Sequence, residues 1–426
     1  MAEAAPGDDD VHLEGQGLDG DMLDRRRFLV GAAAAAGLAL GGGALALERL
    51  LGGSTGLAQP LGEEPAGLPP RQHAWNAALA RDEHGNPVAP RFHRLLFADL
   101  EGRPGAGDVR RLEAVLRTLE RTHPWEPGGL LFVVGWGPRY FERTLGVRSP
   151  VERPKPLSAF ELPALDDYDL CIHLACDDEP RVVAAEQALR GAGGILGWRE
   201  TRTGFVGARL PAAHQNVSGV PSGRPVPASA PLYMGFQSGY RHNQASEDAV
   251  TIPEGALAGG TTMHVSRMRL SLDGWYHLLD ERDRVARMFA PQVTPAQVAR
   301  FATDAPSHPN LLDAAARRYG VVGHAQAAAR ARRNGKPRIL RRDFDTTDDG
   351  VAGLHFVSLQ RTIEDFVATR TAMNAARSSY LNPAITDTVN NGINEFIFVT
   401  HRANYAVPTR AQRAFPLLPG RERALA

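Results

Sequence analysis

Cysteine is nearly absent from this chain of 426 residues, which contains only Cys171 and Cys176. Both lie in the stretch LCIHLACDD, whose composition is typical of a buried strand. Residues five apart on a strand point to opposite faces, so we do not expect a disulfide between them. His173 lies between them and would allow a metal site, but two buried thiols are the stronger interpretation. The fold must then be held by its core.

Net charge is also absent, because 48 basic residues balance 48 acidic ones and the pI is near 7.3. Such a chain has no overall field that would attract nucleic acid or an acidic membrane, so we expect neither as a partner. Its length allows two or three domains, and a hydrophobic content of 43% is enough for a sizeable core.

The chain has no strongly hydrophobic run of the kind that spans a lipid bilayer. Its one long apolar run, rich in Ala, Gly and Leu, ends at Leu47 and is thinner than a spanning helix normally needs. The preceding residues 25–29, RRRFL, have the pattern of a twin-arginine signal. We therefore expect a twin-arginine signal and leader at residues 1–58 and a Pro/Gly-rich linker at residues 59–90.

This signal predicts export by the twin-arginine machinery, which carries proteins that have already folded, often with a cofactor bound. The mature chain would be periplasmic or extracellular. Residues 44–46, ALA, and residues 56–58, GLA, both offer cleavage sites, and an uncleaved signal would tether the chain to the membrane.

Two similar halves follow, which we place at residues 91–225 and 226–426. In the first, strand-type runs are expected at residues 93–100, 130–134, 169–176 and 198–206, with helices after Asp108 and at residues 179–190. The order strand-helix-strand, strand-helix-strand predicts a ferredoxin-like unit, in which helices cover one face of an antiparallel sheet.

The second half has strand-type runs at residues 261–272, 353–360 and 403–407, with helices expected at residues 272–289 and 362–373. The first helix would bury an apolar stripe of Trp275, Leu278, Leu279, Val285 and Met288. The run INEFIFV, residues 393–399, fits a strand or a buried helix equally well. A large insertion occupies residues 290–338.

Two candidate site residues are found here: His324 lies within the insertion, and Arg341 lies just after it. His324 opens an Ala/Arg-rich helical segment, and Arg341 lies on an extended segment that follows a turn at Gly335 and Pro337. A helical imidazole and a neighbouring strand arginine could bracket a flat cofactor. A neutral imidazole can ligate iron, and a guanidinium can stabilise charge on a bound oxygen species. An ordinary surface or core histidine is the competing interpretation.

Several segments in order along residues 91–415 resemble the dye-decolourising (DyP-type) haem peroxidases. They are GWGPRYFER, DLCIHLACDDEPRVVAAEQAL, GGTTMHVSRMRLSLDGWYHLLDERDRVARMF, GHAQAAARARRNGKPRILRRDF, GLHFVSLQRTIEDFV and INEFIFVTHRANYAVP. The resemblance implies an α+β fold of two ferredoxin-like halves, in the dimeric α+β barrel superfamily, with one haem b in the second half. It implies His324 as the axial iron ligand and Arg341 as the distal arginine, and we expect Arg330 to contact the cofactor too. The implied substrates are hydrogen peroxide and a bulky organic reductant, and a homo-oligomer is compatible with it.

One departure from that family lies in its motif GxxDG, which reads GFQSG at residues 235–239. Ser238 replaces an aspartate that is thought to move a proton between the peroxide oxygens. A serine has no group that titrates near neutral pH, so a substitute acid is needed. The predicted catalytic residues are Arg341, Ser238 and Asp343, with Glu247 and Asp248 as further candidates for the acid.

A second departure is Asn391, which stands where an acid that could orient the ligand histidine is expected. Its absence would weaken electron donation to the iron, unless the nearby Asp387 takes its place.

Three functions remain open. The first is a haem peroxidase that oxidises its reductant through surface aromatics such as Trp275 or Tyr240, although core packing is the competing interpretation of both. The second is a haem-binding or haem-handling protein with little peroxidase activity. The third is a haem-free relative that binds another ligand.

Overall fold

The computed structural model describes residues 67–298 and 309–417. The expected signal at residues 1–58 lies outside these ranges. Within them, no helix is both long enough and apolar enough to cross a membrane.

The stretch expected to be a linker is packed on the fold where it is described. Trp75 is only 1% exposed and belongs to the largest hydrophobic cluster. The Gln72 side chain accepts a hydrogen bond from the Val134 backbone N–H at 2.9 Å and donates one to the Pro408 carbonyl at 2.9 Å. Residues 71–79 are therefore part of the core, which corrects the linker prediction there.

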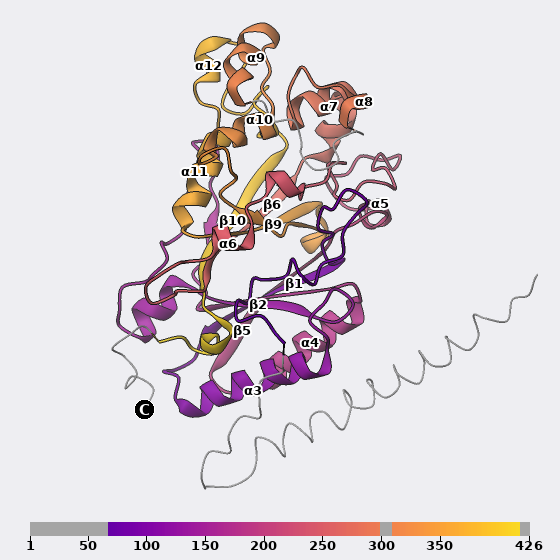
Figure 1. Ribbon diagram of the computed structural model, residues 1–426. Helices are drawn as coiled ribbons and strands as arrows, with labels where there is room; N and C mark the ends of the chain where they lie inside the picture. Colours follow the sequence, from indigo (N-terminus) through magenta and orange to yellow (C-terminus); the bar gives the residue numbers. More distant parts are fainter. Residues whose placement is uncertain (1–66, 299–308, 418–426) are drawn as a thin grey trace, which may run out of the picture. The chain divides into compact units, whose positions relative to one another are not determined.

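The first half has the predicted strand and helix order (Figure 1). Its main elements are β1 (Phe92–Leu100), α3 (Ala106–Thr122), β2 (Leu131–Trp136), β4 (Leu170–Cys176), α4 (Glu179–Gly191) and β5 (Leu196–Phe205). The strands pair in the antiparallel order β2-β4-β1-β5, and helices α3 and α4 pack together over β1 and β4. The order of a ferredoxin-like unit is confirmed.

The second half repeats this order with a short second strand. Its main elements are β6 (Thr261–Leu270), β7 (Leu340–Arg341), β8 (Phe344–Thr346), β9 (Gly353–Gln360), α11 (Ile363–Met373) and β10 (Ile397–Val407). The antiparallel order is β8-β9-β6-β10. The ambiguous run at residues 393–399 is a turn that leads into β10 at Ile397.

The two halves close into one barrel. Strand β5 pairs with β8 at Phe205 and Asp345, and β10 pairs with β2 at Ala406 and Trp136. Alternate residues of the strands meet inside in one hydrophobic cluster, which includes Leu95, Phe97, Val133, Cys171, Val265, Phe344, Val357 and Tyr405. The predicted α+β class with two ferredoxin-like halves is confirmed, and both cysteines are buried, free thiols.

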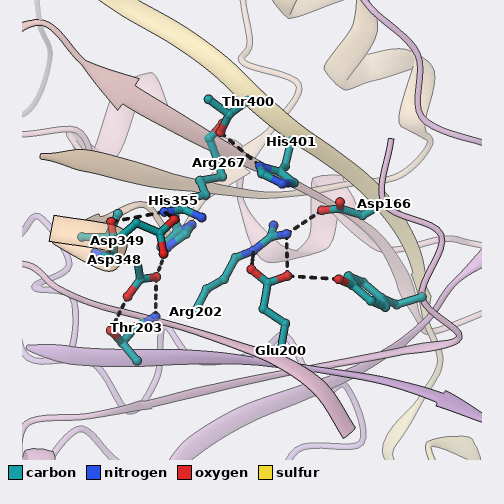
Figure 2. A network of polar contacts seen from close by, with 12 residues as sticks. Asp166, Glu200, Arg202, Thr203, Arg267, Asp348, Asp349, His355, Thr400 and His401 are labelled. Atoms are coloured by element: carbon teal, nitrogen blue, oxygen red, sulfur yellow. Dashed lines mark hydrogen bonds and ion pairs between the residues drawn. The ribbon is translucent and has the colours of Figure 1, made fainter. Parts of the chain in front are cut away.

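A polar network ties the halves together (Figure 2). Asp348 accepts hydrogen bonds from the Thr203 hydroxyl of β5 at 2.7 Å and from His355 of β9 at 3.1 Å. Arg202 is 1% exposed and donates to Asp166 at 2.7 Å and to Glu200 at 2.8 Å. Because the Thr203–Asp348 hydrogen bond joins the two halves and the buried Arg202 is paired with acids, we assign the network a structural role.

The helix expected at residues 272–289 is two elements. A π-helical turn, η4 (Gly274–Leu278), ends at Leu279, and Asp280 then caps α7 (Glu281–Met288) by accepting from the Asp283 N–H at 2.8 Å. Because α7 begins a new helix after this cap, the helical periodicity is interrupted, and Leu278 is 75% exposed. The prediction that Leu278 belongs to the buried stripe is wrong.

Candidate functional site

A cavity of about 220 Å³ lies beside the second-half strands and two helices, α10 (His324–Ala328) and α11. Its apolar wall includes Met234, Phe236, Met268, Leu270, Phe289, Leu354, Phe356, Phe366, Ile393, Ile397 and Val399. Its polar wall includes Ser238, His324, Arg338, Arg341, Asp343, Asp345, Arg370, Asn394 and Arg402.

Strand alternation places the polar residues. Leu340 and Phe344 point into the barrel, so Arg341, Asp343 and Asp345 point outward to the cavity. On β10 a register shift between residues 399 and 401 reverses the alternation, which brings both Val399 and Arg402 to the cavity wall.

His324 opens α10 and lines the cavity, as the sequence predicted for a helix-start residue. Gly323 precedes it where an added Cβ would lie 1.9 Å from the Phe289 carbonyl oxygen, so only glycine permits this approach. Burial, followed by the charges of Arg341 and Arg370, lowers the pKa of His324 to about 3. The imidazole is therefore neutral at physiological pH, which is the form that ligates a metal.

Arg341, Ser238 and Asp343 form one connected group. The Arg341 guanidinium donates to the Ser238 carbonyl, and the Ser238 hydroxyl donates to Asp343 Oδ2 at 2.7 Å. Asp343 Oδ1 is buried without a hydrogen-bond partner. Burial raises the pKa of Asp343 to about 6, although Arg341 and the Ser238 hydroxyl oppose the shift. An acid thus stands beside the serine, in the place where the sequence motif lacks one.

The other expected acids lie elsewhere. Glu247 accepts from the backbone N–H groups of Trp75 and Asn76 at 2.7 Å each, and Asp248 pairs with Arg71 at the surface. Neither lines the cavity.

Arg330 also lies away from the cavity. It is exposed, and its guanidinium is 3.3 Å from Asp313. It belongs to the 3₁₀ turn Ala329–Ala331 that follows α10 and does not line the cavity, which corrects the expectation that Arg330 contacts the cofactor.

The surroundings of His324 contain no carboxylate from the two expected positions. The Asn391 amide donates to the carbonyls of Asn374, Thr386 and Asp387, and the Asp387 side chain is exposed.

The two aromatics proposed as surface oxidation sites are not at the surface. Trp275 is 0% exposed and Tyr240 is 9% exposed, and Tyr240 lines the cavity. Both belong to hydrophobic clusters, so the core-packing interpretation holds for them.

Sequence reasoning missed Asp345, Arg370 and Arg402. Asp345 could have been found, because it shares the alternation of Asp343 on one extended segment. Arg402 could not, because the register shift that turns it toward the cavity leaves no mark in the sequence.

Within the described ranges, no cluster of three or more His, Cys, Asp or Glu side chains could hold a metal ion, so His324 would be a lone protein ligand.

Solved structures share this fold. A DyP-type peroxidase from Cellulomonas bogoriensis is 21% identical, with a TM-score of 0.56 over 79% of this chain and 97% of that one. Ferric DtpA from Streptomyces lividans is 20% identical, with a TM-score of 0.55 over 83% and 99%. A variant of DypB from Rhodococcus jostii RHA1 in complex with heme is 14% identical, with a TM-score of 0.53 over 81% and 98%. At these identities the likeness shows the DyP-type fold alone.

No curated protein sequence matches the chain. A family profile does match it over residues 90–409, which is most of its length. This member has the DyP-type fold. The chain thus belongs to DUF7405, a family of unknown function.

Proposed function

We propose that the chain is a haem-dependent peroxidase of the DyP type, which uses hydrogen peroxide to oxidise bulky organic reductants. The observation that carries the proposal is one cavity that joins a neutral imidazole, His324, to Arg341 and the buried acid Asp343. The DyP-type fold supports it, as does the heme in the similar DypB variant.

The cavity residues fit a haem. His324 would ligate the iron, and the apolar wall suits a flat macrocycle. Arg370 and Arg402 line the cavity, and within the described ranges they share one acid, Glu161, which lies 3.6 Å from Arg370 and 2.9 Å from Arg402. One positive charge is thus left over, and Arg402 Nε is buried without a partner. These two arginines would hold the propionate groups.

Bound haem would supply the redox chemistry that carries electrons from the reductant to peroxide. The chain's own groups would manage protons and charge. Above pH 6 most of Asp343 is ionised, so it can take a proton from peroxide through the Ser238 hydroxyl that it holds. The Arg341 guanidinium would stabilise the negative charge that this leaves on the peroxide.

A haem-handling protein with little peroxidase activity is the second candidate. It is favoured by the surroundings of His324, where Asn391 offers an amide in place of a carboxylate. Without a carboxylate to polarise the imidazole, the iron would receive less electron density.

Haem binding can be tested by absorption spectroscopy after purification with added haem. We expect a Soret band that His324→Ala abolishes and that His277→Ala, an exposed control outside the cavity, leaves unchanged. If the unaltered chain shows no Soret band, both haem-based functions are excluded and the cavity binds another ligand.

Peroxidase activity can be tested by peroxide-dependent dye oxidation with the haem-loaded chain. We expect Arg341→Leu to lower the rate by roughly 10²–10³-fold, the usual effect of removing one charge-stabilising donor. Arg330→Leu is the matched control, because this arginine is exposed. Haem binding without dye oxidation in the unaltered chain would instead support the haem-handling function.

We further propose export in folded form by the twin-arginine machinery, on the pattern RRRFL at residues 25–29. The mature chain would be periplasmic or extracellular, or tethered if the signal is uncleaved. Replacing Arg25 and Arg26 by Lys should hold the chain in the cytoplasm, which cell fractionation would show. Light scattering of the purified chain would test the expected homo-oligomer.

A further inference from the structure

Asp345 is the most deeply buried carboxyl group of the cavity wall, with 0% exposure. It lies on β8, which pairs with β5 at Phe205 and with β9 at Leu354. Its Oδ2 accepts a hydrogen bond from the Tyr233 backbone N–H at 2.6 Å, whereas its Oδ1 is buried without a partner. Asp345 lines the cavity, and a strand paired on both sides fixes its position, so the unpartnered oxygen needs either a proton of its own or a ligand.

Asp343 and Asp345 are two residues apart on one extended segment and point to the same side, into the cavity. Their environments differ. Asp343 has the Arg341 guanidinium, the Ser238 hydroxyl and the Val357 backbone N–H around it. Asp345 has the Tyr233 N–H, two buried phenols nearby and the carboxylate of Asp343, and it forms no ion pair with any residue that the structure describes.

These environments separate the two ionisations. Burial raises the pKa of Asp343 to about 6, while burial and the charge of Asp343 raise the pKa of Asp345 well above its usual range. At neutral pH the first group is therefore largely a carboxylate, whereas burial and the neighbouring carboxylate make the second group hold its proton more strongly. Two titratable groups whose environments divide them in this way are typical of an acid and a base that act on one ligand.

We propose that Asp345 is a hydrogen-bond donor of the site: its neutral carboxyl group donates to an oxygen of the peroxide whose proton Asp343 accepts. This inference rests on the proposed function and extends it, because it gives the site two acids with divided roles. The proton of Asp345 stays on its carboxyl group, and its contribution is to hold and polarise the ligand oxygen opposite the base.

The protonation state can be measured without cofactor, by infrared spectroscopy of the purified chain near pH 7.5. We expect the carbonyl stretch of a protonated carboxylic acid to lose intensity in Asp345→Asn and to keep it in Asp343→Asn. Asp387→Asn, at an exposed side chain, is the control and should leave the band unchanged. An unchanged band in Asp345→Asn would overturn the proposal. This measurement requires no haem, so it still tests the protonation of Asp345 if the chain proves not to be a haem peroxidase.

The donor role can be measured as the rate of peroxide consumption by the haem-loaded chain. An asparagine amide still donates a hydrogen bond, so Asp345→Asn should stay within about threefold of the unaltered chain, while Asp345→Val should lose about tenfold. Equal losses in the two variants would contradict a donor role. If Asp345→Val does not fold, a loss of tenfold or more in Asp345→Asn alone would also contradict it.

Discussion

Replacing Asp343 by Asn should stabilise the fold while it disables the proposed base. Asp343 is 9% exposed, and burial raises its pKa from 3.8 to about 6. The difference of about two pH units corresponds to about 3 kcal/mol, at roughly 1.4 kcal/mol per unit. This is the free energy that the folded chain loses by keeping the carboxylate ionised in the cavity wall, and an asparagine of the same shape does not lose it.

The sign follows from proton linkage. Because the folded pKa is raised, the folded chain binds more protons than the unfolded chain, so the contribution of Asp343 to stability is fully present below about pH 4 and is lost as the pH rises through 6. The variant and the unaltered chain should therefore melt together near pH 4. Near pH 7.5 the variant should melt about 4 °C higher, from 3 kcal/mol and the usual unfolding entropy of a unit of this size.

Thermal melts of the chain without added cofactor, at several values between pH 4 and pH 8, would measure this difference. The informative quantity is the change of the difference with pH, because a constant offset would only report repacking. A variant that melts lower than the unaltered chain at pH 7.5, after agreement at pH 4, would refute the reasoning. It would mean that Arg341 and the Ser238 hydroxyl compensate the buried charge fully.

The remaining predictions concern the other parts of the site and the barrel. Ser238→Asp should shift the pH–rate profile of peroxide consumption upward, since a second carboxylate beside Asp343 would favour a shared proton. Gly392→Ala should weaken haem uptake in a spectroscopic titration and cost about 1–2 kcal/mol, because φ is +57° and the new Cβ would lie 3.1–3.2 Å from the backbone and Cβ of His324. Trp75→Ala should lower the free energy of unfolding by about 3–5 kcal/mol in denaturant melts, because the indole fills the core.

Each of these has a control or an excluding result. Higher turnover in Ser238→Asp without a shift of the profile would show that Asp343 is not the base. Gly335→Ala shares the strained backbone, with φ of +74°, but its Cβ would meet open space, so it should leave haem uptake unchanged. A fully stable Trp75→Ala variant would restore the linker interpretation of residues 71–79.

Most of the elements and the direction of many side chains can be predicted from the sequence alone. The apolar pattern predicts the bounds of β1, β4 and β9 to within one residue. A buried strand can be found in this way because its apolar residues are neighbours in the sequence. Alternation along residues 340–345 also determined that Arg341 shares a face with Asp343. The pattern does not predict the side to which a residue points where a helix cap or a register shift intervenes. Leu278 is exposed for the first reason, and Arg402 faces the cavity for the second.

Which residues come into contact, in contrast, depends on how distant segments fold together. Ser238 and Asp343 are 105 residues apart in sequence, and their 2.7 Å hydrogen bond exists because the segment before β6 folds back over the outer face of β8. Tertiary packing likewise buries Trp75 in the hydrophobic cluster and leaves Arg330 exposed, although the local sequence pattern marks neither position. Burial then sets the chemistry, because the pKa of an acid depends on how much water and which charges surround it in space. The sequence carries the aspartate, and its burial in the folded cavity raises its pKa to about 6.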